Sequence, residues 1–391
     1  MKLSSLLPFA LPLLLAACGG NDPVEPPSVL ALIGDMPYGT SPTDTSQFAA
    51  NPGFIAAINK DSDVGLVIHA GDIHSGKQYC TQSYNAAVFE QWKAFKAPLV
   101  YIPGDNEWTD CHKAGEGGGT YNASKGTIDF ILDASGNPAS YKNGDPFENL
   151  KLVRQLMFAT PGKSVIGSMD VNSQALLADA ANPGDKAFVE NVWFEKSKVM
   201  FVTVNLPGGS NNDTDIWYGA PAMSQSQADE VATRTAADLR WLDIAFKKAT
   251  EHGDLAVMIT LQADMWDNDG KPATHLSQYK QFIERIASNT KAFGKPVLLI
   301  NGDSHIYRSD NPLKQGAPCA IENTPGTKTV ACAADAYASQ PYGYDIANFH
   351  RIVVHGSTTP LEWLKLTVDP TRNAAASENA IGPFSWVRVQ P

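Results

Sequence analysis

The chain has 391 residues, with 30 basic and 41 acidic side chains and a formal net charge of −11. An acidic protein is a poor non-specific ligand for nucleic acids, so we expect no nucleic-acid binding. The length is enough for one large α/β domain or two medium ones. Because no internal Pro/Ser-rich linker divides the sequence, we expect residues 29–391 to form a single domain.

The amino terminus has the features of an export signal. Lys2 supplies a positive charge, and the apolar stretch from Leu6 to Ala17 is too short to span a bilayer. The tetrapeptide Leu-Ala-Ala-Cys ends at Cys18 and resembles the bacterial lipobox, whose cysteine is lipidated and becomes the first mature residue. The alternatives are an ordinary signal peptide cut at Ala-x-Ala and a cysteine present by chance. We expect residues 1–17 to be a signal peptide.

Residues 18–28 are polar and rich in Gly and Pro, which predicts a flexible tether between the lipidated cysteine and the folded domain. Position 19 is Gly and not the Asp that resembles an inner-membrane retention signal. The sequence therefore favours an exported lipoprotein of the outer membrane, with the lipid anchor as its membrane partner. The oligomeric state is left open.

The apolar runs and helical patterns that follow predict an α/β fold. Expected helices lie near Phe48–Asn59, Tyr84–Phe95, Phe147–Phe158, Ser224–His252 and Leu276–Phe293. Expected strands are Val29–Ile33, Val64–His69, Leu99–Ile102, Phe188–Phe194, Val199–Val204, Leu255–Leu261, Val297–Ile300, Arg351–His355, Leu361–Val368 and Phe384–Val389. A loop-rich insertion occupies about 112–145. This order predicts a four-layer α/β/β/α sandwich of two mixed sheets flanked by helices.

Aspartates follow four of these strands, each directly after a Gly. They are Asp35, Asp72, Asp105 and Asp303, the last of them followed by His305. Ligands of open α/β sheets bind beyond the carboxyl ends of the strands. Clustered carboxylates repel one another unless a cation joins them. The pattern predicts a metal site at the C-terminal ends of the strands; the alternative is that the aspartates cap the helices that follow.

Four cysteines remain besides Cys18, and an exported protein tolerates disulfides. Cys80 and Cys111 lie in loops that leave adjacent strand ends, which favours a bridge between them. Cys319 and Cys332 bracket a loop rich in Pro, Gly and Thr, which their bridge would close. Sequence alone permits three pairings of four cysteines.

Five strand-end motifs occur in order along the chain: GDMPY at 34–38, GDIHSG at 71–76, GDNE at 104–107, LQAD at 261–264 and GDSH at 302–305. In order, spacing and strand context they resemble the motifs of the calcineurin-like metallophosphoesterase superfamily, on its purple acid phosphatase side. The resemblance covers about residues 29–310. It implies hydrolysis of phosphate mono- or diesters of a small phosphorylated substrate by a hydroxide that bridges two divalent metal ions.

The resemblance also implies the metal ligands. The matching positions are Asp35, Asp72 and His305 for the first ion, and Asp72, Asp105, Gln262 and Asp303 for the second, with Asp72 shared.

The chain departs from the family pattern mainly at histidines. Pro37, Asn106, Gln262 and Asp303 stand where the family has histidine, and Asp105 stands where it has asparagine. Three of the altered ligand positions keep an oxygen donor. Oxygen-rich sites suit hard cations, so we expect Mn²⁺ or Mg²⁺, with Ca²⁺ or Fe as further candidates, in preference to Zn²⁺.

The general acid is not identified by the motifs. Asn106 occupies the position of the family's catalytic histidine but cannot donate a proton as histidine does. His74 and His112, each close to a motif, are the candidates, and Tyr38 or a metal-bound water is the alternative.

Four residues are expected to support the ligands: Tyr38, Glu107, Asp264 and Asn205. Asp264 is also the alternative to Gln262 as the ligand of the fourth motif. The segment 207–212 follows Asn205 and either binds phosphate through backbone N–H groups or is a solvated turn, which we favour.

Three functions are compatible with these observations. The first, which we favour, is a metal-dependent phosphoesterase at the cell surface. The second is a degenerate family member that binds a phosphorylated or glycan ligand without turnover, as the loss of histidines suggests. The third is a structural lipoprotein that keeps only the fold. Hydrolysis of an aryl phosphate with different metals added back distinguishes the first from the others.

Overall fold

The computed structural model describes residues 25–267, 276–322, 329–332, 344–354, 356–358 and 362–390. The predicted signal peptide, Cys18 and most of the tether lie outside these ranges. The first of two large sheets runs in the order β16 (Ala374–Ser377), β17 (Ala380–Gly382), β18 (Phe384–Val389), β15 (Trp363–Val368), β1 (Ser28–Ile33), β2 (Val64–His69) and β3 (Leu99–Tyr101). Strands β1, β2 and β3 are parallel, and β15 is antiparallel to β1.

The second sheet runs in the order β13 (Thr329–Ala331), β12 (Ala320–Glu322), β11 (Arg308–Asp310), β14 (Phe349–Val353), β10 (Val297–Asn301), β9 (Ala256–Thr260), β8 (Val199–Thr203), β7 (Val192–Lys196) and β6 (Asn172–Ser173). Strands β8, β9, β10 and β14 are parallel, while β7 and β11 are antiparallel to their neighbours. Both sheets are therefore mixed.

The central strands are buried on both faces, which explains their continuous apolar runs. In β1, Leu30 and Leu32 face the second sheet, while Ala31 and Ile33 face the helices. In β10, Leu298 and Ile300 join the same core between the sheets, and Leu299 points outward. Successive side chains of a strand point to opposite faces, so each central strand contributes to two cores.

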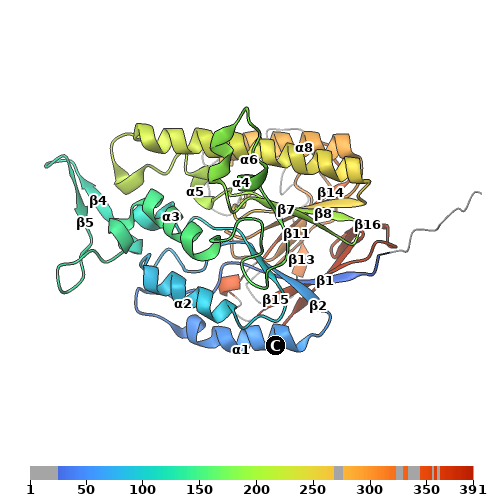
Figure 1. The fold of residues 1–391 in the computed structure, drawn as a ribbon, viewed down its shortest axis with the longest axis horizontal. Coiled ribbons are helices and arrows are strands. Elements are labelled where there is room, and N and C mark those ends of the chain that lie inside the picture. Colours follow the sequence, from blue (N-terminus) through green and yellow to red (C-terminus); the bar gives the residue numbers. More distant parts are fainter. Residues whose placement is uncertain are drawn as a thin grey trace, which may run out of the picture.

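Helices cover the outer face of each sheet. Helices α1 (Ser46–Lys60), α2 (Gln82–Trp92) and α3 (Pro146–Met157) pack on the first sheet, and α6 (Gln225–His252) and α8 (Lys280–Phe293) on the second. Figure 1 shows α1 and α2 on one side of the sheets and α6 and α8 on the other. The predicted four-layer sandwich is confirmed.

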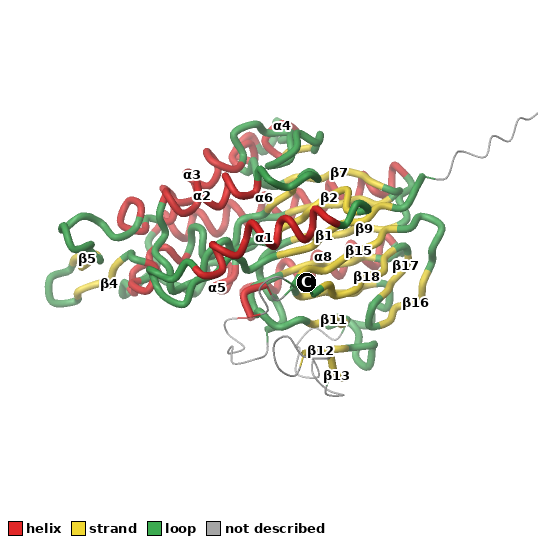
Figure 2. Tube along the Cα trace, turned by 90° about the horizontal axis from the view of Figure 1, so that it is seen from below, coloured by secondary structure: helices red, strands yellow, loops and turns green. Residues whose placement is uncertain are grey.

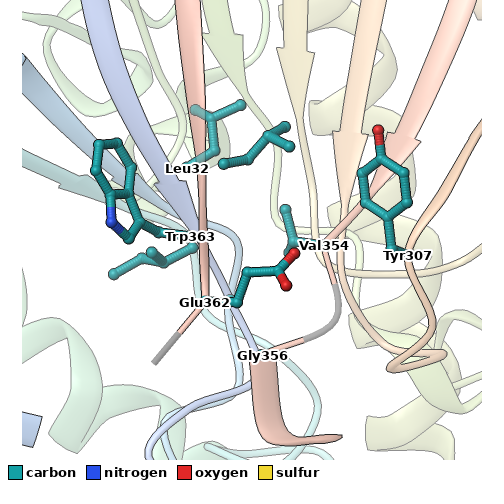
Figure 3. Close-up of a pocket in the computed structure, with 9 residues that line it drawn as sticks. Leu32, Tyr307, Val354, Gly356, Glu362 and Trp363 are labelled. Atoms are coloured by element: carbon teal, nitrogen blue, oxygen red, sulfur yellow. The ribbon is translucent and has the colours of Figure 1, made fainter. Parts of the chain in front are cut away.

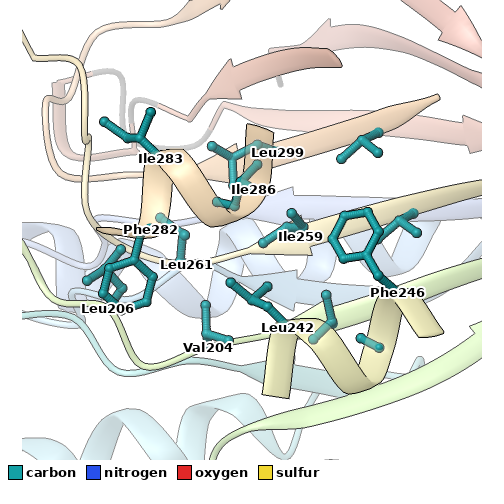
Figure 4. Packing of buried hydrophobic residues seen from close by; sticks show 14 of the residues in the cluster. Val204, Leu206, Leu242, Phe246, Ile259, Leu261, Phe282, Ile283, Ile286 and Leu299 are labelled. Carbon is teal, nitrogen blue, oxygen red and sulfur yellow. The ribbon is translucent and has the colours of Figure 1, made fainter. Parts of the chain in front are cut away.

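The long helix α6 shows how the sequence specifies these layers. The Ser224 side chain accepts the N–H of Gln227 at the start of the helix, and Gly253 ends it in the left-handed conformation with φ 76°. Leu242 and Phe246 lie one helical turn apart and pack against Phe282 and other side chains of the second sheet and α8 (Figure 4).

The insertion at 112–145 contains a hairpin of β4 (Gly119–Asn122) and β5 (Thr127–Phe130), which projects away from the sheets in Figures 1 and 2. Short helices flank it, namely η1 (Asp110–His112), η2 (Ala114–Glu116) and η3 (Tyr141–Gly144). The other short helices are α4 (Gln174–Leu177), η4 (Pro183–Ala187), α5 (Gly208–Asn211), η5 (Trp217–Gly219), η6 (Ser277–Tyr279) and η7 (Gly356–Thr358).

Two details differ from the sequence prediction. Strand β7 begins at Val192, because residues 183–187 form a 3₁₀ helix where the apolar run near Phe188 suggested a strand start. The short strands β11, β12, β16 and β17, at or near the edges of the sheets, were not predicted, because their sequences show little alternation of apolar and polar residues. In the described residues, no helix is both long enough and apolar enough to cross a membrane.

Two disulfides, Cys80–Cys111 and Cys319–Cys332, agree with the predicted pairing. The first joins the loops that follow β2 and β3, which are adjacent and parallel. The loops that carry Asp72 and Asp105 are thus tied together covalently.

Candidate metal centre

The predicted ligands lie just beyond strand ends, in unusual backbone conformations. Asp35 follows β1, Asp72 follows β2, and Asp303 and His305 follow β10. All four have positive φ, of 51°, 60°, 75° and 60° respectively. Residues other than Gly avoid this left-handed region, and such strain gathers at functional sites. The sharp turns hold the side chains at the common rim of the two sheets.

Asp35, Asp72 and His305 form one potential ligand group, in which one atom of each lies within 4.8 Å of the others. His305 Nε2 is 3.4 Å from Asp35 Oδ1. The Asp35 Oδ2 atom is buried and has no hydrogen-bond partner in the described part of the chain. A buried carboxylate oxygen without a partner is costly, and a cation at this point would satisfy it. These residues therefore fit a metal ion.

A second group lies on the other side of Asp72. The Gln262 amide donates from Nε2 to Asp72 Oδ2, at 3.2 Å, and to Asp105 Oδ1, at 3.0 Å. Its Oε1 accepts the backbone N–H of Gly208 at 2.5 Å. In this structure the amino group of Gln262, and not its oxygen, faces the two carboxylates. Gln262 thereby holds Asp72 and Asp105 together.

The segment 207–212 covers these carboxylates. A Cβ atom on Gly208 would lie 2.4 Å from Asp105 Oδ2 and 2.9 Å from Asp303 Oδ1, so only glycine fits there. Gly208, Ser210 and Asn211 are all buried. The preference for a solvated turn is therefore wrong: this segment is buried, and its Gly208 lies against the carboxylates of Asp105 and Asp303. The sequence of this segment, with Gly-Gly among other turn-forming residues, did not distinguish a buried segment from a solvated turn.

The site concentrates negative charge. Burial, and then the carboxylates of Asp105, Glu107 and Asp35, raise the pKa of Asp72 well above its usual range. Burial, and then Asp110 among other carboxylates, likewise raises the pKa of Asp105. Neither Asp72 nor Asp105 forms an ion pair with a lysine or arginine of the described ranges. Close carboxylates without a counter-charge are expected where a cation binds.

The pKa of His305 responds to the same charge. Burial lowers it, but the carboxylates of Asp35, Asp303 and Asp267 outweigh burial, so the pKa of His305 lies above its ordinary value. The raised pKa of His305 therefore reports the same concentration of negative charge at this point of the site.

Tyr38 and Asn106 line the site beside Asp72. The Tyr38 hydroxyl donates to Asp72 Oδ2 at 2.7 Å and lies 3.3 Å from His305 Nε2. The Asn106 amide donates to Asp72 Oδ2, to the Tyr38 hydroxyl and to the carbonyl of His74. Burial, followed by Asp72 and Asp35, raises the pKa of Tyr38 well above 10, so the hydroxyl keeps its proton at neutral pH.

The two candidate histidines lie away from the cleft. His74 is fully buried, and burial lowers its pKa to about 4. His112 accepts the N–H of Tyr218 at Nδ1 and lies 4.0 Å from Asp215. Lys113 bridges Asp215 and Asp110 with 2.6 Å contacts. Neither histidine is among the residues that line the cleft.

The remaining predicted residues have structural partners. Glu107 accepts from Ile73 N, Gly104 N and the Tyr101 hydroxyl, and so joins the loops after β2 and β3. Asp264 is fully buried and pairs with Arg351.

Asn205 lies deeper, away from the cleft. Its amide donates to Glu190 at 2.8 Å, and its backbone N–H donates to Asn191. Asn205 therefore packs in a polar network behind strands β7 and β8 and does not line the cleft.

A cleft of about 610 Å³ opens onto the carboxylates. Its walls are Tyr38, Gly39, Thr40, Asp44, Ser46, Gln47, Asp72, Ser75, Gly76, Lys77, Asp105, Asn106, Asp303, His305 and Ser357. The loop residues 39–47, Lys77 and Ser357 were not predicted, because loop residues carry no periodic signal that places them in space.

Figure 3 shows a second hollow, lined by Leu32, Val354, Trp363 and neighbouring residues. Its volume of about 10 Å³ is room for no more than about one water molecule. This hollow is therefore too small for a substrate, whereas the cleft at the carboxylates has room for one.

A purple acid phosphatase from the seeds of yellow lupin (Lupinus luteus) is a solved structure similar to this chain, with a TM-score of 0.38 and 10% sequence identity. The similarity covers 94% of this chain and 54% of the lupin chain, so the chain spans about half the length of the structure that it matches. No family model and no curated protein matches the chain. The assignment of the site rests on its motifs and geometry.

Proposed function

We propose that the protein is a metal-dependent phosphoester hydrolase of the metallophosphoesterase type. The observation that carries this proposal is the convergence of oxygen ligands and one histidine from separate strand ends on one cleft. Asp35, Asp72, Asp105, Asp303 and His305 take part, and all of them except Asp105 have positive φ. A fold does not by itself imply a function, and this constellation of side chains is the specific argument.

Two divalent cations fit the residues. Asp35, Asp72 and His305 would hold one, and Asp72, Asp105 and Asp303 the other, with Gln262 as a further candidate ligand. When bound, such a pair activates water and neutralises the charge of a phosphoryl group. The donor set favours Mn²⁺ or Mg²⁺.

The chain's own residues position the substrate. The Tyr38 hydroxyl and the Asn106 amide keep Asp72 in one orientation and present polar atoms to the cleft. Lys77 is exposed at the cleft wall and has no ion pair with a described residue, so its ammonium group is free to meet phosphate oxygens. We infer that Tyr38, whose hydroxyl stays protonated, is the proton donor nearest to the carboxylates.

The function is tested by hydrolysis of an aryl phosphate and of a bis-aryl diester by chelator-treated protein, with Mn²⁺, Mg²⁺, Ca²⁺, Fe or Zn²⁺ added back. We expect turnover with Mn²⁺ or Mg²⁺ and a loss of at least about tenfold in Tyr38→Phe. Metal retention without turnover of either ester would favour the alternative of ligand binding only, which Asn106 at the position of the family's histidine suggests. No retained metal would contradict both.

We further propose that the protein is exported and anchored through a lipid on Cys18, at the outer membrane. The support is the predicted signal peptide and lipobox. Cys18→Ser should yield uncleaved, non-acylated precursor in a radiolabelled-lipid assay. Acylation and membrane attachment unchanged in that variant would contradict this proposal.

A further inference from the structure

The Cys80–Cys111 disulfide lies beside a buried histidine. A ring nitrogen of His74 and both sulfur atoms lie within 4.8 Å of one another, and all three residues are fully buried. His74 and the cysteines come from the loops after β2 and β3, directly behind the cleft wall. This group is not part of the carboxylate cluster described above.

The two ring nitrogens of His74 differ in their hydrogen bonding. Its Nδ1 faces the carbonyl of Ser75 at 3.4 Å, while its Nε2 is buried and has no hydrogen-bond partner among the described residues. Metal-binding histidines characteristically donate one ring N–H to a backbone carbonyl and coordinate through the other nitrogen. A buried ring nitrogen without a partner is otherwise costly.

A carboxylate lies next to one sulfur of the disulfide. Glu116 is buried, and its Oε2 lies 3.5 Å from Cys80 Sγ. In a tetrahedral zinc site, with Zn–S near 2.3 Å and Zn–O near 2.0–2.2 Å, sulfur and oxygen ligands are separated by about 3.6 Å. Cys80 and Glu116 already have about this separation.

We propose that, when the Cys80–Cys111 disulfide is reduced, Cys80, Cys111, His74 and Glu116 bind one Zn²⁺ ion. Two thiolates and an imidazole suit Zn²⁺ better than they suit the cations expected in the cleft, which prefer oxygen ligands. The ion then replaces the disulfide as the link between the two loops. The carbonyl of Asn106, which lies 3.3 Å from Cys80 Sγ and 3.4 Å from Cys111 Sγ, would stay in place in both states.

Reduction of the disulfide precedes zinc binding. A phosphine and one water reduce the disulfide to two thiols, and the phosphine keeps the oxygen of the water as the phosphine oxide. Two molecules of a small thiol do the same by exchange and are joined to each other in a new disulfide. Each thiol then loses its proton as its sulfur binds Zn²⁺, so that binding releases two protons from the cysteines. The site is independent of the proposed phosphoesterase activity.

The test compares the full chain in its oxidised form and after reduction with a phosphine, both incubated with Zn²⁺ and passed through a desalting column. We expect the reduced protein to keep one Zn²⁺ more than the oxidised protein, since the cleft is common to both. X-ray absorption should show zinc–sulfur scattering near 2.3 Å in the reduced protein only. Equal zinc content, or additional zinc without sulfur neighbours, overturns the proposal.

Variants locate the site. Cys80→Ser and His74→Ala should lose the additional ion or bind it at least about tenfold more weakly. The matched control is the double variant Cys319→Ser/Cys332→Ser, which removes the other disulfide and should keep the ion. Loss of the ion in this control, or its full retention in Cys80→Ser, contradicts the assignment. The comparison of the parent protein in its two redox states decides the matter even if a variant does not fold.

Discussion

Two groups of buried carboxylates in this protein differ in how their charge is balanced. Asp264 and Asp310 both pair with Arg351, and all three side chains are fully buried. Asp72 and Asp105, in the cleft, receive hydrogen bonds from neutral amides and a hydroxyl instead. Arg351 balances the charge of the first group. The charge of the second group is not balanced by an ion pair with any lysine or arginine of the described residues.

This difference indicates which carboxylates are available to bind a cation. Asp264 sits in a strand-end motif like the others, and sequence alone made it a candidate ligand. Its ion pair with Arg351 instead fastens the end of β9 to β14. Burying a charge costs several kcal/mol unless it is paired, so the cleft carboxylates require either raised pKa values or bound cations. Four predictions test this comparison.

The largest effect is expected at Asp72, which lies between the two ligand groups. Asp72→Asn should reduce aryl phosphate turnover by at least about a thousandfold, because it removes the shared ligand and with it both ions. Elemental analysis should show the loss of metal, and thermal unfolding of the chelator-treated variant should show no loss of stability. Full metal occupancy in Asp72→Asn would contradict the assignment of Asp72 as the shared ligand.

In contrast to Asp72→Asn, a substitution in the group of Asp264, Asp310 and Arg351 should lower the stability of the protein. Arg351→Leu leaves two buried carboxylates facing each other, which should cost about 3–5 kcal/mol of the free energy of unfolding. Urea denaturation measures this value. The control is Lys93→Ala, which removes an exposed ion pair with Glu90 and should cost less than about 1 kcal/mol. Similar costs for the two variants would mean that Arg351 is not the counter-charge of this group.

The contrast also shows what sequence can predict. The sequence predicted strands β1, β2, β3 and β10 and the aspartates that follow them, because apolar runs and the Gly-Asp pairs at their ends are local signals. The four layers followed from the order of the elements.

What the sequence could not predict depends on contacts between distant segments. Asp264 is set apart from the cleft carboxylates by its ion pair with Arg351, which lies far along the chain on β14. The closeness of Gly208 to Asp105 and Asp303, and the distance of His112 from the cleft, are likewise set by loops without periodicity. The strands β11, β12, β16 and β17 are short, and their pairing is determined by the neighbouring strands and not by their own composition.

The cleft carboxylates should make the stability of the protein depend on both pH and bound metal. The raised pKa values of Asp72 and Asp105 mean that the metal-free folded state holds protons that the unfolded state releases above about pH 4. Their stabilising contribution is complete below the unfolded pKa and is lost as pH rises through the folded pKa. Chelator-treated protein should therefore become less stable between pH 5 and pH 8.

Added Mn²⁺ should cancel this loss. A ligand at a hundred times its Kd stabilises by about 2.7 kcal/mol, and cations bind the ionised carboxylates that high pH favours. Thermal unfolding with and without Mn²⁺ at both pH values measures the effect, and Asp72→Asn serves as the control with a weaker pH dependence. A metal-free protein that is more stable at pH 8 than at pH 5 would show that the cleft carboxylates are already compensated.

The smallest expected effect concerns the choice of metal. Asp303 stands where the family has histidine, and Asp303→His replaces a carboxylate by an imidazole at the same strand end. The φ of 75° is tolerable, because histidine enters the left-handed region more readily than most residues do. The backbone N–H of position 303 still reaches Asp35 Oδ1. The change lowers the negative charge of the site and adds a nitrogen donor, so the preference should move from Mn²⁺ or Mg²⁺ toward Zn²⁺ or Fe by about tenfold.

Metal-titrated rates of the parent and of Asp303→His measure this shift, and zinc and manganese affinities measured by competition with a chelator report it without depending on turnover. The paired carboxylates offer the control: Asp310→Asn changes one charge of the Arg351 group, which lies outside the cleft lining, and should leave the metal preference unchanged. A parent enzyme most active with Zn²⁺ would mean that the oxygen-rich ligand set does not govern selectivity. An unchanged preference in Asp303→His would place the governing ligands among the other strand-end residues.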